Sequence, residues 1–157
     1  DSGGVVIVPA LSGLGAPHWQ ADARGVIAGL SFASGKAHLA RAALEAMAHQ
    51  THDLATAFAA DGAAWQALRI DGGMSANDWM AQDLADMLDL PAERPDFVET
   101  TALGAAMLAA VGCGLYHSLE EAARMRGGVT RFAPTLDPGA REIRLAGWAD
   151  ALSRVLR

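Results

Sequence analysis

Residues 70–78 read Ile-Asp-Gly-Gly-Met-Ser-Ala-Asn-Asp and separate a predicted strand from a predicted helix. Residues 67–71 alternate as a strand does, and residues 77–88 ("NDWMAQDLADML") have the apolar spacing of a helix. One glycine is enough for a sharp turn. Two adjacent glycines predict in addition that something approaches the backbone closely, because glycine carries no Cβ and tolerates positive φ.

The residues after the glycines favour a ligand at the start of this helix. Ser75 suits an N-cap, and Asp78 three residues later completes a variant of the capping box. The first N–H groups of a helix are unpaired and carry the positive end of its dipole, so this turn can bind a phosphate or a ribose. Asn77 would project an amide from the first turn. The alternative, which the motif leaves open, is a plain strand-to-helix turn, with Asp71 accepting hydrogen bonds from nearby backbone N–H groups.

Outward from this turn, strands and helices alternate, which is typical of an α/β fold with short connections. Strands are expected near residues 5–9 and 25–30, in one sheet with 67–71, and an extended piece lies between Pro91 and Pro95. Helices are expected at residues 37–59, 101–111 and 118–126, and from Asp137-Pro138 to near the C-terminus, with Ser118 and Asp137 as N-caps.

The longest predicted helix, residues 37–59, has one apolar and one polar face. The apolar face is expected to be buried on the sheet and contains Leu39, Ala43, Met47, Leu54 and Phe58. The polar face contains His38, Arg41, Glu45, His49, His52 and Thr56. Glu45, His49 and His52 have a spacing that metal ligands also use, but no fourth ligand is evident and a solvated face is favoured. No metal-binding residue is therefore predicted.

Composition excludes several classes of function. The 157 residues are 52% hydrophobic and carry a net charge of −6, with Lys36 the only lysine, so a nucleic-acid partner is not expected. A single cysteine, Cys113, favours a reducing, cytoplasmic compartment. No apolar run approaches the roughly 20 residues that span a bilayer, and the start "DSGG" does not lead us to expect a signal peptide. The start "DSGG", without Met, predicts an entry part-way through a larger protein, with a processed small protein as the alternative.

Other phosphate and nucleophile motifs are absent. The segment "GLSFASGKA" (29–37) has five residues between its glycines, where a P-loop has four, and Ala37 stands where Ser or Thr would bind Mg²⁺. No G-x-G-x-x-G follows a strand, and "ALSGL" (10–14) lacks the first glycine of a nucleophile elbow.

Several segments in order resemble the FGGY family of carbohydrate kinases. "VPALSGLGAPHWQADARG" (8–25) is similar to a segment of the glycerol kinases of that family, more than to members acting on xylulose, ribulose or gluconate. The second half of the family signature starts at "GVIAGL" (25–30) and closes on "HLARAALE" (38–45). "IDGGMSAND" (70–78) resembles the family's adenosine motif, and "ETTALGAAMLA" (99–109) the helix that follows it.

The resemblance implies a ribonuclease-H-like α/β fold of the actin, Hsp70 and sugar-kinase type, with a mixed sheet flanked by helices. Residues 1–157 would form a single domain, the C-terminal FGGY domain of a longer two-domain kinase with ATP/ADP and Mg²⁺ in the interdomain cleft. In the family motif, the backbone of Gly73 approaches the nucleotide and the side chain of Asn77 hydrogen-bonds to it. Gly72 would then make the turn and Gly73 would keep the surface bare.

The family's catalytic aspartate, its first phosphate loop and its glycerol-binding residues have no match in this chain, so no catalytic residue is predicted. The chain alone is expected to be inactive, while the full-length enzyme is expected to be a cytoplasmic, homo-oligomeric glycerol kinase without a membrane span. Two alternatives remain: a kinase for another polyol or sugar such as xylulose, and a non-catalytic nucleotide-binding or association module.

Overall fold

Two short β-sheets form the frame of the molecule in the computed structural model, which describes residues 1–156. Strands β1 (Val6–Val8) and β2 (Val26–Ala28) pair antiparallel, with Ile7 opposite Ile27. In the second sheet, β4 (Ala92–Pro95) lies between β3 (Leu68–Arg69), to which it is parallel, and β5 (Val129–Phe132), to which it is antiparallel. The second sheet is therefore mixed.

Four of the five helices that the structure describes lie between strands in the sequence, and the fifth follows the last strand. The longest is α1 (Lys36–Ala60), between the two sheets in sequence, and α2 (Asp78–Leu88) joins β3 to β4. The remaining helices, in chain order, are α3 (Thr100–Gly112), the single turn α4 (Leu119–Ala122) and α5 (Pro138–Ser153). Two 3₁₀ turns, η1 (Gly73–Ala76) and η2 (Ala123–Arg126), complete the order. None of the helices that the structure describes is long and apolar enough to cross a membrane.

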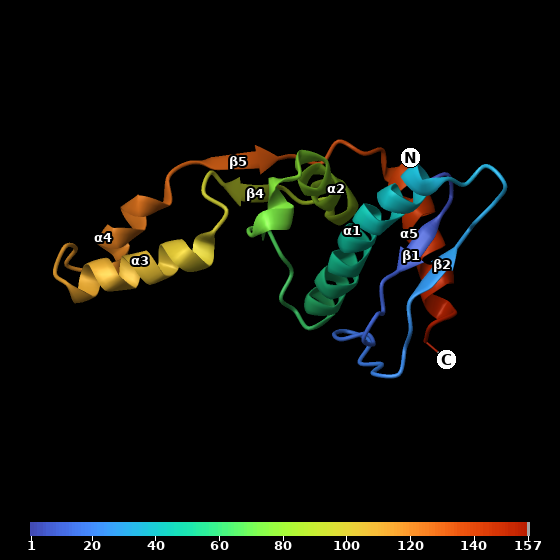
Figure 1. The fold of residues 1–157 in the computed structure, drawn as a ribbon, viewed down its shortest axis with the longest axis horizontal. Helices are drawn as coiled ribbons and strands as arrows, with labels where there is room; N and C mark the ends of the chain where they lie inside the picture. Colours follow the sequence, from blue (N-terminus) through green and yellow to red (C-terminus); the bar gives the residue numbers. More distant parts are fainter. Residues whose placement is uncertain (157) are drawn as a thin grey trace.

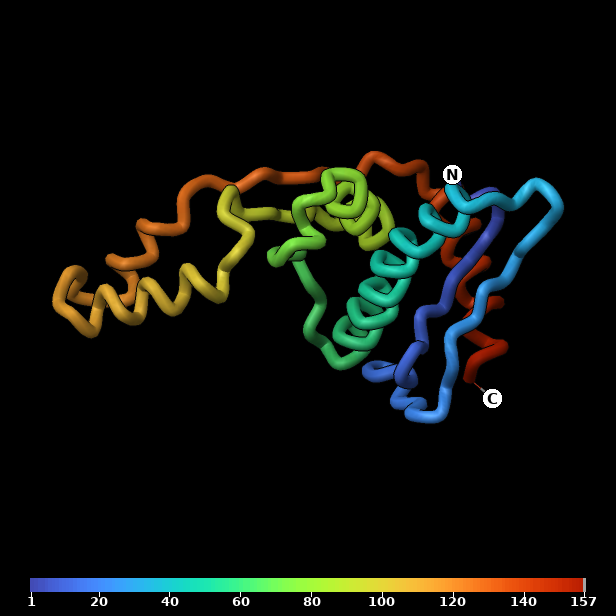
Figure 2. The backbone as a smooth tube through the Cα atoms, in the orientation of Figure 1, coloured from blue at the N-terminus to red at the C-terminus, as the bar shows by residue number. Residues whose placement is uncertain are grey.

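The chain starts at one end of the molecule, extends to the opposite end in α3 and α4, and returns to the first end in α5. Figure 1 shows β1, β2, α1 and α5 gathered at one end, while α3 and α4 project from the other side of β4 and β5 as an arm. In the tube view of Figure 2, the chain returns from this arm through β5 to α5, beside β1 at the N-terminal end. Segments from the two ends of the sequence therefore pack together.

Two clusters of buried side chains make up the core. The first joins β1, the loop after it and α5, and it contains Val8, Ala10, Leu14, Ala23, Trp148, Ala151 and Leu152. The second joins α1 to α2 and contains Ala48, Met80, Leu84 and Met87, with Leu68 and Ile70 packed against it. The helix α1 contacts both α2 and β1, and it links the two clusters.

Most of the predicted elements are confirmed. The expected strands and helices are present at or within a few residues of the predicted positions, in a mixed α/β arrangement. The N-caps predicted at Ser118 and Asp137 are present: the Ser118 hydroxyl accepts from Glu121 N at 3.2 Å, and the Asp137 carboxylate accepts from Gly139 N at 2.9 Å. The prediction that the first three strands share one sheet is wrong, because β1 and β2 pair only with each other and β3 pairs with β4.

The strand β5 was not predicted. Three of its four residues are exposed, so its sequence, Val129-Thr-Arg-Phe132, has no buried face that would mark it as a strand. It forms because β4 offers an edge, where Arg94 lies opposite Thr130 and Pro95 opposite Val129. A pairing partner more than 30 residues away cannot be recognised from local periodicity.

The predicted faces of the longest helix are also wrong, although the helix itself is confirmed. Phe58 is 47% exposed and Ala43 is exposed, whereas Glu45 and His49 of the predicted polar face are 9% and 3% exposed. Because α2 and β1 contact α1 from different sides, the buried residues are spread around it. They include small alanines that allow close approach, and the buried set is Ala42, Glu45, Ala46, Ala48 and His49.

His49 lies in a buried polar setting between α1 and α5. Its ring stacks on Trp148, with centroids 5.2 Å apart, and neither ring nitrogen has a hydrogen-bond partner within residues 1–156. Trp148 Nε1 in turn donates to Asp53 Oδ2 at 2.9 Å, and His18 Nε2 lies 3.0 Å from the same oxygen. Asp53 therefore ties the loop after β1 and the helix α5 to α1.

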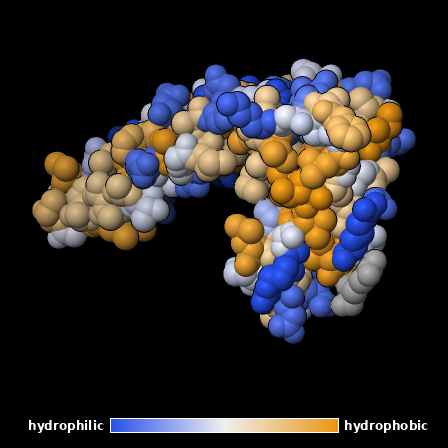
Figure 3. Space-filling model, turned by 45° about the vertical axis from the view of Figure 1, so that its right-hand side comes forward, coloured by the Kyte–Doolittle hydropathy of each residue, from blue (hydrophilic) through white to orange (hydrophobic). Residues whose placement is uncertain are grey.

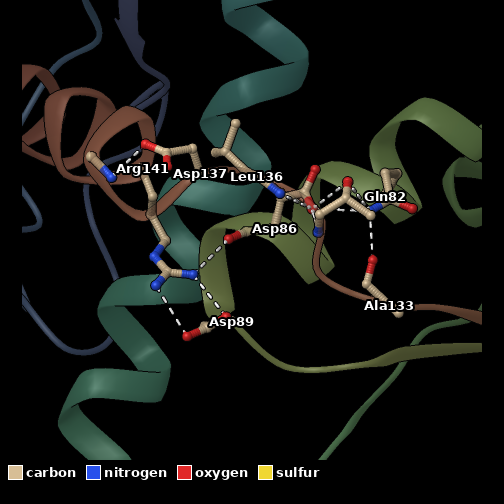
Figure 4. Close-up of polar contacts among 9 residues, drawn as sticks. Gln82, Asp86, Asp89, Ala133, Leu136, Asp137 and Arg141 are labelled. Atoms are coloured by element: carbon tan, nitrogen blue, oxygen red, sulfur yellow. Dashed lines mark hydrogen bonds and ion pairs between the residues drawn. The ribbon is translucent and has the colours of Figure 1, made fainter.

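The segment between β5 and α5 is fastened to α2 by polar contacts (Figure 4). Asp86 Oδ1 accepts from the backbone N–H groups of Thr135, at 2.6 Å, and Leu136, at 3.1 Å. Gln82 donates to the carbonyl of Ala133 at 2.8 Å, and Arg141 forms an ion pair with Asp89 at 2.9 Å. These contacts fix where the chain enters α5.

Apolar side chains also reach the surface. In Figure 3, apolar surface lies on the compact end, bordered by hydrophilic residues, and also at the end of the arm. The large exposed side chains at the compact end include Leu11, Trp19, Ile27, Leu30 and Phe32, and those of the arm are Leu108, Leu115 and Leu119.

The buried, neutral His49 predicts that the protein loses stability in mild acid. Burial, and then the charges of Arg144 and His52, lower the pKa of His49 from 6.5 to about 4. Between these two values the unfolded chain binds the proton and the folded chain does not, so stability falls as pH falls. The loss from His49 should reach about 3 kcal/mol at pH 4. Urea unfolding between pH 4 and 7 measures it.

The variant His49→Phe should flatten this pH dependence, because phenylalanine can keep the stacking on Trp148 but does not titrate. Part of the slope should remain, since burial lowers the pKa of His52 as well. His117→Phe, at an exposed position, is the matched control and should keep the wild-type slope. An unchanged slope in His49→Phe would contradict the prediction.

Candidate functional site: the glycine turn at the start of α2

The two glycines between β3 and α2 have different conformations. Gly72 has φ 81° and ψ 171°, a combination almost restricted to glycine, and its N–H donates to the Val98 carbonyl at 2.8 Å. Gly73 does not have a positive φ, is exposed, and an added Cβ would meet no atom within 4 Å. The fold therefore requires glycine at position 72, and nothing in the described chain requires it at position 73.

The N-cap of α2 lies two residues later than predicted. Asn77, and not Ser75, is the N-cap of α2: its Oδ1 accepts from Met80 N at 3.2 Å. Ser75 lies in the 3₁₀ turn η1, is 1% exposed, and donates its hydroxyl to the Gly72 carbonyl at 2.7 Å. The 3₁₀ turn inserts one extra turn of chain between the glycines and the helix. Asn is as strong an N-cap residue as Ser, so residue type alone could have identified Asn77.

The two predicted nucleotide-binding residues lie on the same short turn. The backbone of Gly73 is exposed at its start and the side chain of Asn77 is exposed at its end, beside the unpaired N–H groups of α2. Because Oδ1 of Asn77 caps the helix, its amide nitrogen is left as a free donor, with no partner in residues 1–156. The turn thus presents backbone N–H groups, an amide donor and, at Gly73, exposed backbone without a side chain.

Arg94, on β4, holds this turn from the neighbouring strand and was missed in the sequence. Its Nη1 donates to the Ser75 carbonyl at 2.8 Å and lies 2.8 Å from Asp78 Oδ1. The guanidinium group also lies over the Phe132 ring, 5.1 Å from its centroid, and the side chain is 17% exposed. The segment around Arg94 was expected to be extended, but only the parallel pairing of β3 and β4 brings it beside the turn.

Asp71 connects the turn to the arm. Its carboxylate accepts a hydrogen bond from the Thr100 hydroxyl at the start of α3, and not from the backbone N–H groups that were expected. Two cavities meet at Asp71 and Ile70. One, of about 540 Å³, lies between the second sheet and α3, and the other, of about 410 Å³, lies between α1 and the turn.

The histidines of α1 do not form a metal centre with their neighbours. In the described part of the chain, no group of three or more His, Cys, Asp or Glu side chains is arranged to hold a metal ion. The expectation of a solvated polar face also fails for Glu45 and His49, which are buried. The only positively charged side chain bonded to the glycine turn in the residues described is Arg94.

The strand β3, the glycine turn and the helix α2 belong to a mixed α/β unit that has the actin, Hsp70 and sugar-kinase type of fold. Residues 1–113 match the family model described as the FGGY family of carbohydrate kinases, C-terminal domain. The chain belongs to this family.

Relatives of known sequence include the glycerol kinase of Rhodospirillum centenum, 57% identical over 98% of this chain, and that of Gluconobacter oxydans, 53% identical over 99%. The chain spans 31% of the length of each of these relatives.

Solved structures share the fold. The crystal structure of Plasmodium falciparum glycerol kinase with ADP matches all of this chain with a TM-score of 0.84 and 33% identity, over 32% of its own chain. The gluconate kinase of Lactobacillus acidophilus matches 98% of this chain and 31% of its own, with a TM-score of 0.74 and 24% identity.

The different conformations of the glycines predict opposite effects of alanine on stability. Gly72→Ala should destabilise the protein by about 1–3 kcal/mol, because its φ and ψ are strained for any residue with a Cβ. Gly73→Ala should stay within about 0.5 kcal/mol of the wild type, because its Cβ would point into open space. Urea unfolding of the two variants measures the difference. Equal losses in both would show that the turn requires both glycines for folding.

Proposed function

We propose that the chain is the C-terminal domain of an ATP-dependent glycerol kinase, which converts ATP and glycerol to ADP and glycerol 3-phosphate. The proposal is supported by relatives named glycerol kinase at 57% and 53% identity and by the similarity to a glycerol kinase structure with ADP. In it, this domain supplies the adenosine side of the nucleotide site. Glycerol and the catalytic base belong to the rest of the full-length protein, which works as a homo-oligomer in the cytoplasm.

The proposed nucleotide site rests mainly on Gly73, because no contact in the described chain explains why this position is a glycine. A Cβ there would meet no atom of the described chain within 4 Å, and φ is not positive. Open space next to a glycine is expected where a ligand lies against the backbone. We therefore assign Gly73 to close contact with the nucleotide and the free amide nitrogen of Asn77 to a hydrogen bond with it.

The residues present fit a nucleotide better than they fit a metal ion. The turn offers donors at a helix N-terminus, which suit phosphate or ribose oxygens. Because the residues described contain no cluster of metal ligands, we assign Mg²⁺ to no side chain of this chain. Mg²⁺ is commonly held by substrate phosphates and one or two carboxylates, and it would neutralise charge on the transferred phosphoryl group.

A kinase for another polyol or sugar is the second candidate within the enzyme class. This candidate is supported by the shared fold, since the structures of a gluconate kinase and a xylulose kinase match this chain with TM-scores of 0.74 and 0.72. Sequence identity favours glycerol as the substrate. The gluconate and xylulose kinase structures are 24% identical to the chain, whereas the glycerol kinase of Rhodospirillum centenum is 57% identical.

The first test is Gly73→Val in the full-length protein. Two methyl groups should occupy the space of the ligand and weaken ADP binding at least tenfold, with little change in melting temperature because the space is open in this chain. Isothermal titration calorimetry with ADP measures the affinity. The matched control is Gly112→Val at the far end of α3, where an added Cβ also meets nothing within 4 Å. If both variants bind ADP like the wild type, position 73 belongs to a plain turn.

Asn77→Ser separates the binding role of Asn77 from its capping role. Serine can still cap α2, but it lacks the amide donor, so ADP affinity should fall several-fold for a lost hydrogen bond of about 1 kcal/mol. Asn77→Ala also removes the cap and should in addition destabilise the protein by about 0.5–2 kcal/mol. Calorimetric titration together with thermal unfolding separates the two effects. An unchanged ADP affinity in Asn77→Ser would remove Asn77 from the site.

The 157-residue chain alone should show no glycerol-dependent phosphoryl transfer. Transfer depends on positioning and charge stabilisation across a closed cleft, and this chain supplies one side of it. A coupled ADP-release assay with glycerol, ATP and Mg²⁺ on the purified chain tests this. Turnover in the usual kinase range of about 1–100 s⁻¹ would show that the chain contains a complete active site.

A further inference from the structure

The glycine turn has little packing of its own to hold it in shape. Its residues, Gly73-Met-Ser-Ala76, are exposed except for Ser75, and even the large Met74 side chain is 55% exposed. A 3₁₀ turn has weaker hydrogen-bond geometry than an α-helix. Contacts from other elements must therefore determine where the backbone of Gly73 and the side chain of Asn77 lie.

One hydrogen bond holds the start of the turn and one holds its end. The Gly72 N–H bonds to the Val98 carbonyl at 2.8 Å, which holds the start, and Asn77 caps α2, which holds the end. The middle of the turn is held by a side chain from a neighbouring strand. There the Ser75 carbonyl accepts from Arg94 Nη1 at 2.8 Å, and this is the only hydrogen bond from a side chain of another element to η1 in residues 1–156.

Arg94 is held firmly enough to act as a support. Its side chain is 17% exposed, lies over Phe132 and starts from β4, the central strand of its sheet. The same Nη1 lies 2.8 Å from Asp78 in the first turn of α2, so one cation bridges η1 and α2. Asp78 is 78% exposed, which makes the ion pair the weaker contact and the hydrogen bond to Ser75 the stronger one.

We propose that Arg94 is a positioning residue for nucleotide binding: it fixes the turn from Gly73 to Asn77 so that both binding groups face the ligand together. This inference rests on the proposed nucleotide site. In it, Arg94 acts through the Ser75 carbonyl and does not touch the nucleotide, because its Nη1 is already engaged by Ser75 and its charge is balanced by Asp78.

The distinction between positioning and direct contact can be measured with two ligands. A cation that bound phosphate would contribute to ADP binding and not to adenosine binding. A residue that positions the turn contributes equally to both, because both ligands use the same turn. The experiment therefore titrates ADP and adenosine separately into the full-length protein by calorimetry.

The test variant is Arg94→Gln, and the matched control is Arg131→Gln on the adjacent strand β5, whose side chain is 64% exposed. Arg94→Gln should weaken both ADP and adenosine about tenfold, the effect of losing one hydrogen bond to a charged group. Asp78→Asn, which leaves the bond to Ser75 in place, should stay within about twofold of the wild type. Arg131→Gln should bind both ligands like the wild type.

Hydrogen exchange gives a second measurement that does not depend on a ligand. In Arg94→Gln, the amides of residues 73–77 should exchange faster, while those in the middle of α2 keep their protection. Unchanged exchange at the turn would overturn the inference. Loss of protection throughout the protein would overturn it as well, since Arg94 would then support the whole fold and not the turn.

The results also separate this inference from the proposed function. If Gly73→Val weakens ADP binding and Arg94→Gln does not, the nucleotide site stands and the role of Arg94 is wrong. A loss of ADP affinity without a loss of adenosine affinity would make Arg94 a phosphate ligand and overturn the positioning role. If neither Gly73→Val nor Arg94→Gln changes the affinity for either ligand, the proposed site itself fails and the inference fails with it.

Discussion

The buried ion pair between Asp83 and Arg144 joins α2, which contributes to the second core cluster, to α5, which contributes to the first. Arg144 on α5 donates to both carboxylate oxygens of Asp83 on α2, at 2.6 and 2.9 Å, and Asp83 is 3% exposed. Burial raises the pKa of Asp83, and the hydrogen bonds from Arg144 oppose this shift. Removing one partner of such a pair typically costs about 3–5 kcal/mol, because it leaves an unpaired buried charge. The pair therefore holds α2 and α5 together at one point along each helix.

This arrangement determines the position of the candidate site. Since α2 is fixed at Asp83 and again at Asp86, where the segment before α5 is bonded, its first turn cannot shift along the sheet. The glycine turn precedes α2 directly, and its contacts to Val98 and Arg94 fix it relative to β4. A binding surface made of backbone atoms has no side chains that can adapt to a ligand. It depends on a rigid surrounding structure, which the ion pair and the sheet supply.

The sequence predicts the parts of this structure that depend on local signals. The glycine turn, the helix after it and the caps at Ser118 and Asp137 follow from residue types at fixed spacing. The family resemblance is likewise a property of ordered local motifs. The buried face of α1 does not follow, because two different neighbours cover it and one of its partners, Arg144, is about 100 residues away in sequence. The hydrophobic pattern of the sequence predicted that Glu45 and His49 lie on the surface. Their burial beside Trp148 and Arg144 depends on tertiary packing.

In the candidate site, too, the sequence predicts the residues that have a local signal and misses the one that depends on tertiary contacts. Gly72 and Asn77 have conformations that their residue types predict, although the cap was first assigned to Ser75. Arg94 carries no signal in its own segment, since a single arginine in a short extended piece between two prolines does not mark a contact with another element. Its role depends on the parallel pairing of β3 with β4, a contact between segments more than 20 residues apart.

The exposed apolar surface is consistent with a domain that works as part of a longer chain. Leu108 and Leu115 on the arm are 62% and 70% exposed, and Leu11 and Trp19 at the compact end are 85% and 75% exposed. Extended apolar surface of this kind commonly marks contact with other protein. The chain spans 31% of the length of its glycerol kinase relatives, so a longer protein of that size would have ample material to cover it. In the proposed kinase, the apolar surface would bind the remaining polypeptide, and the exposed backbone at Gly73 would stay open to the nucleotide.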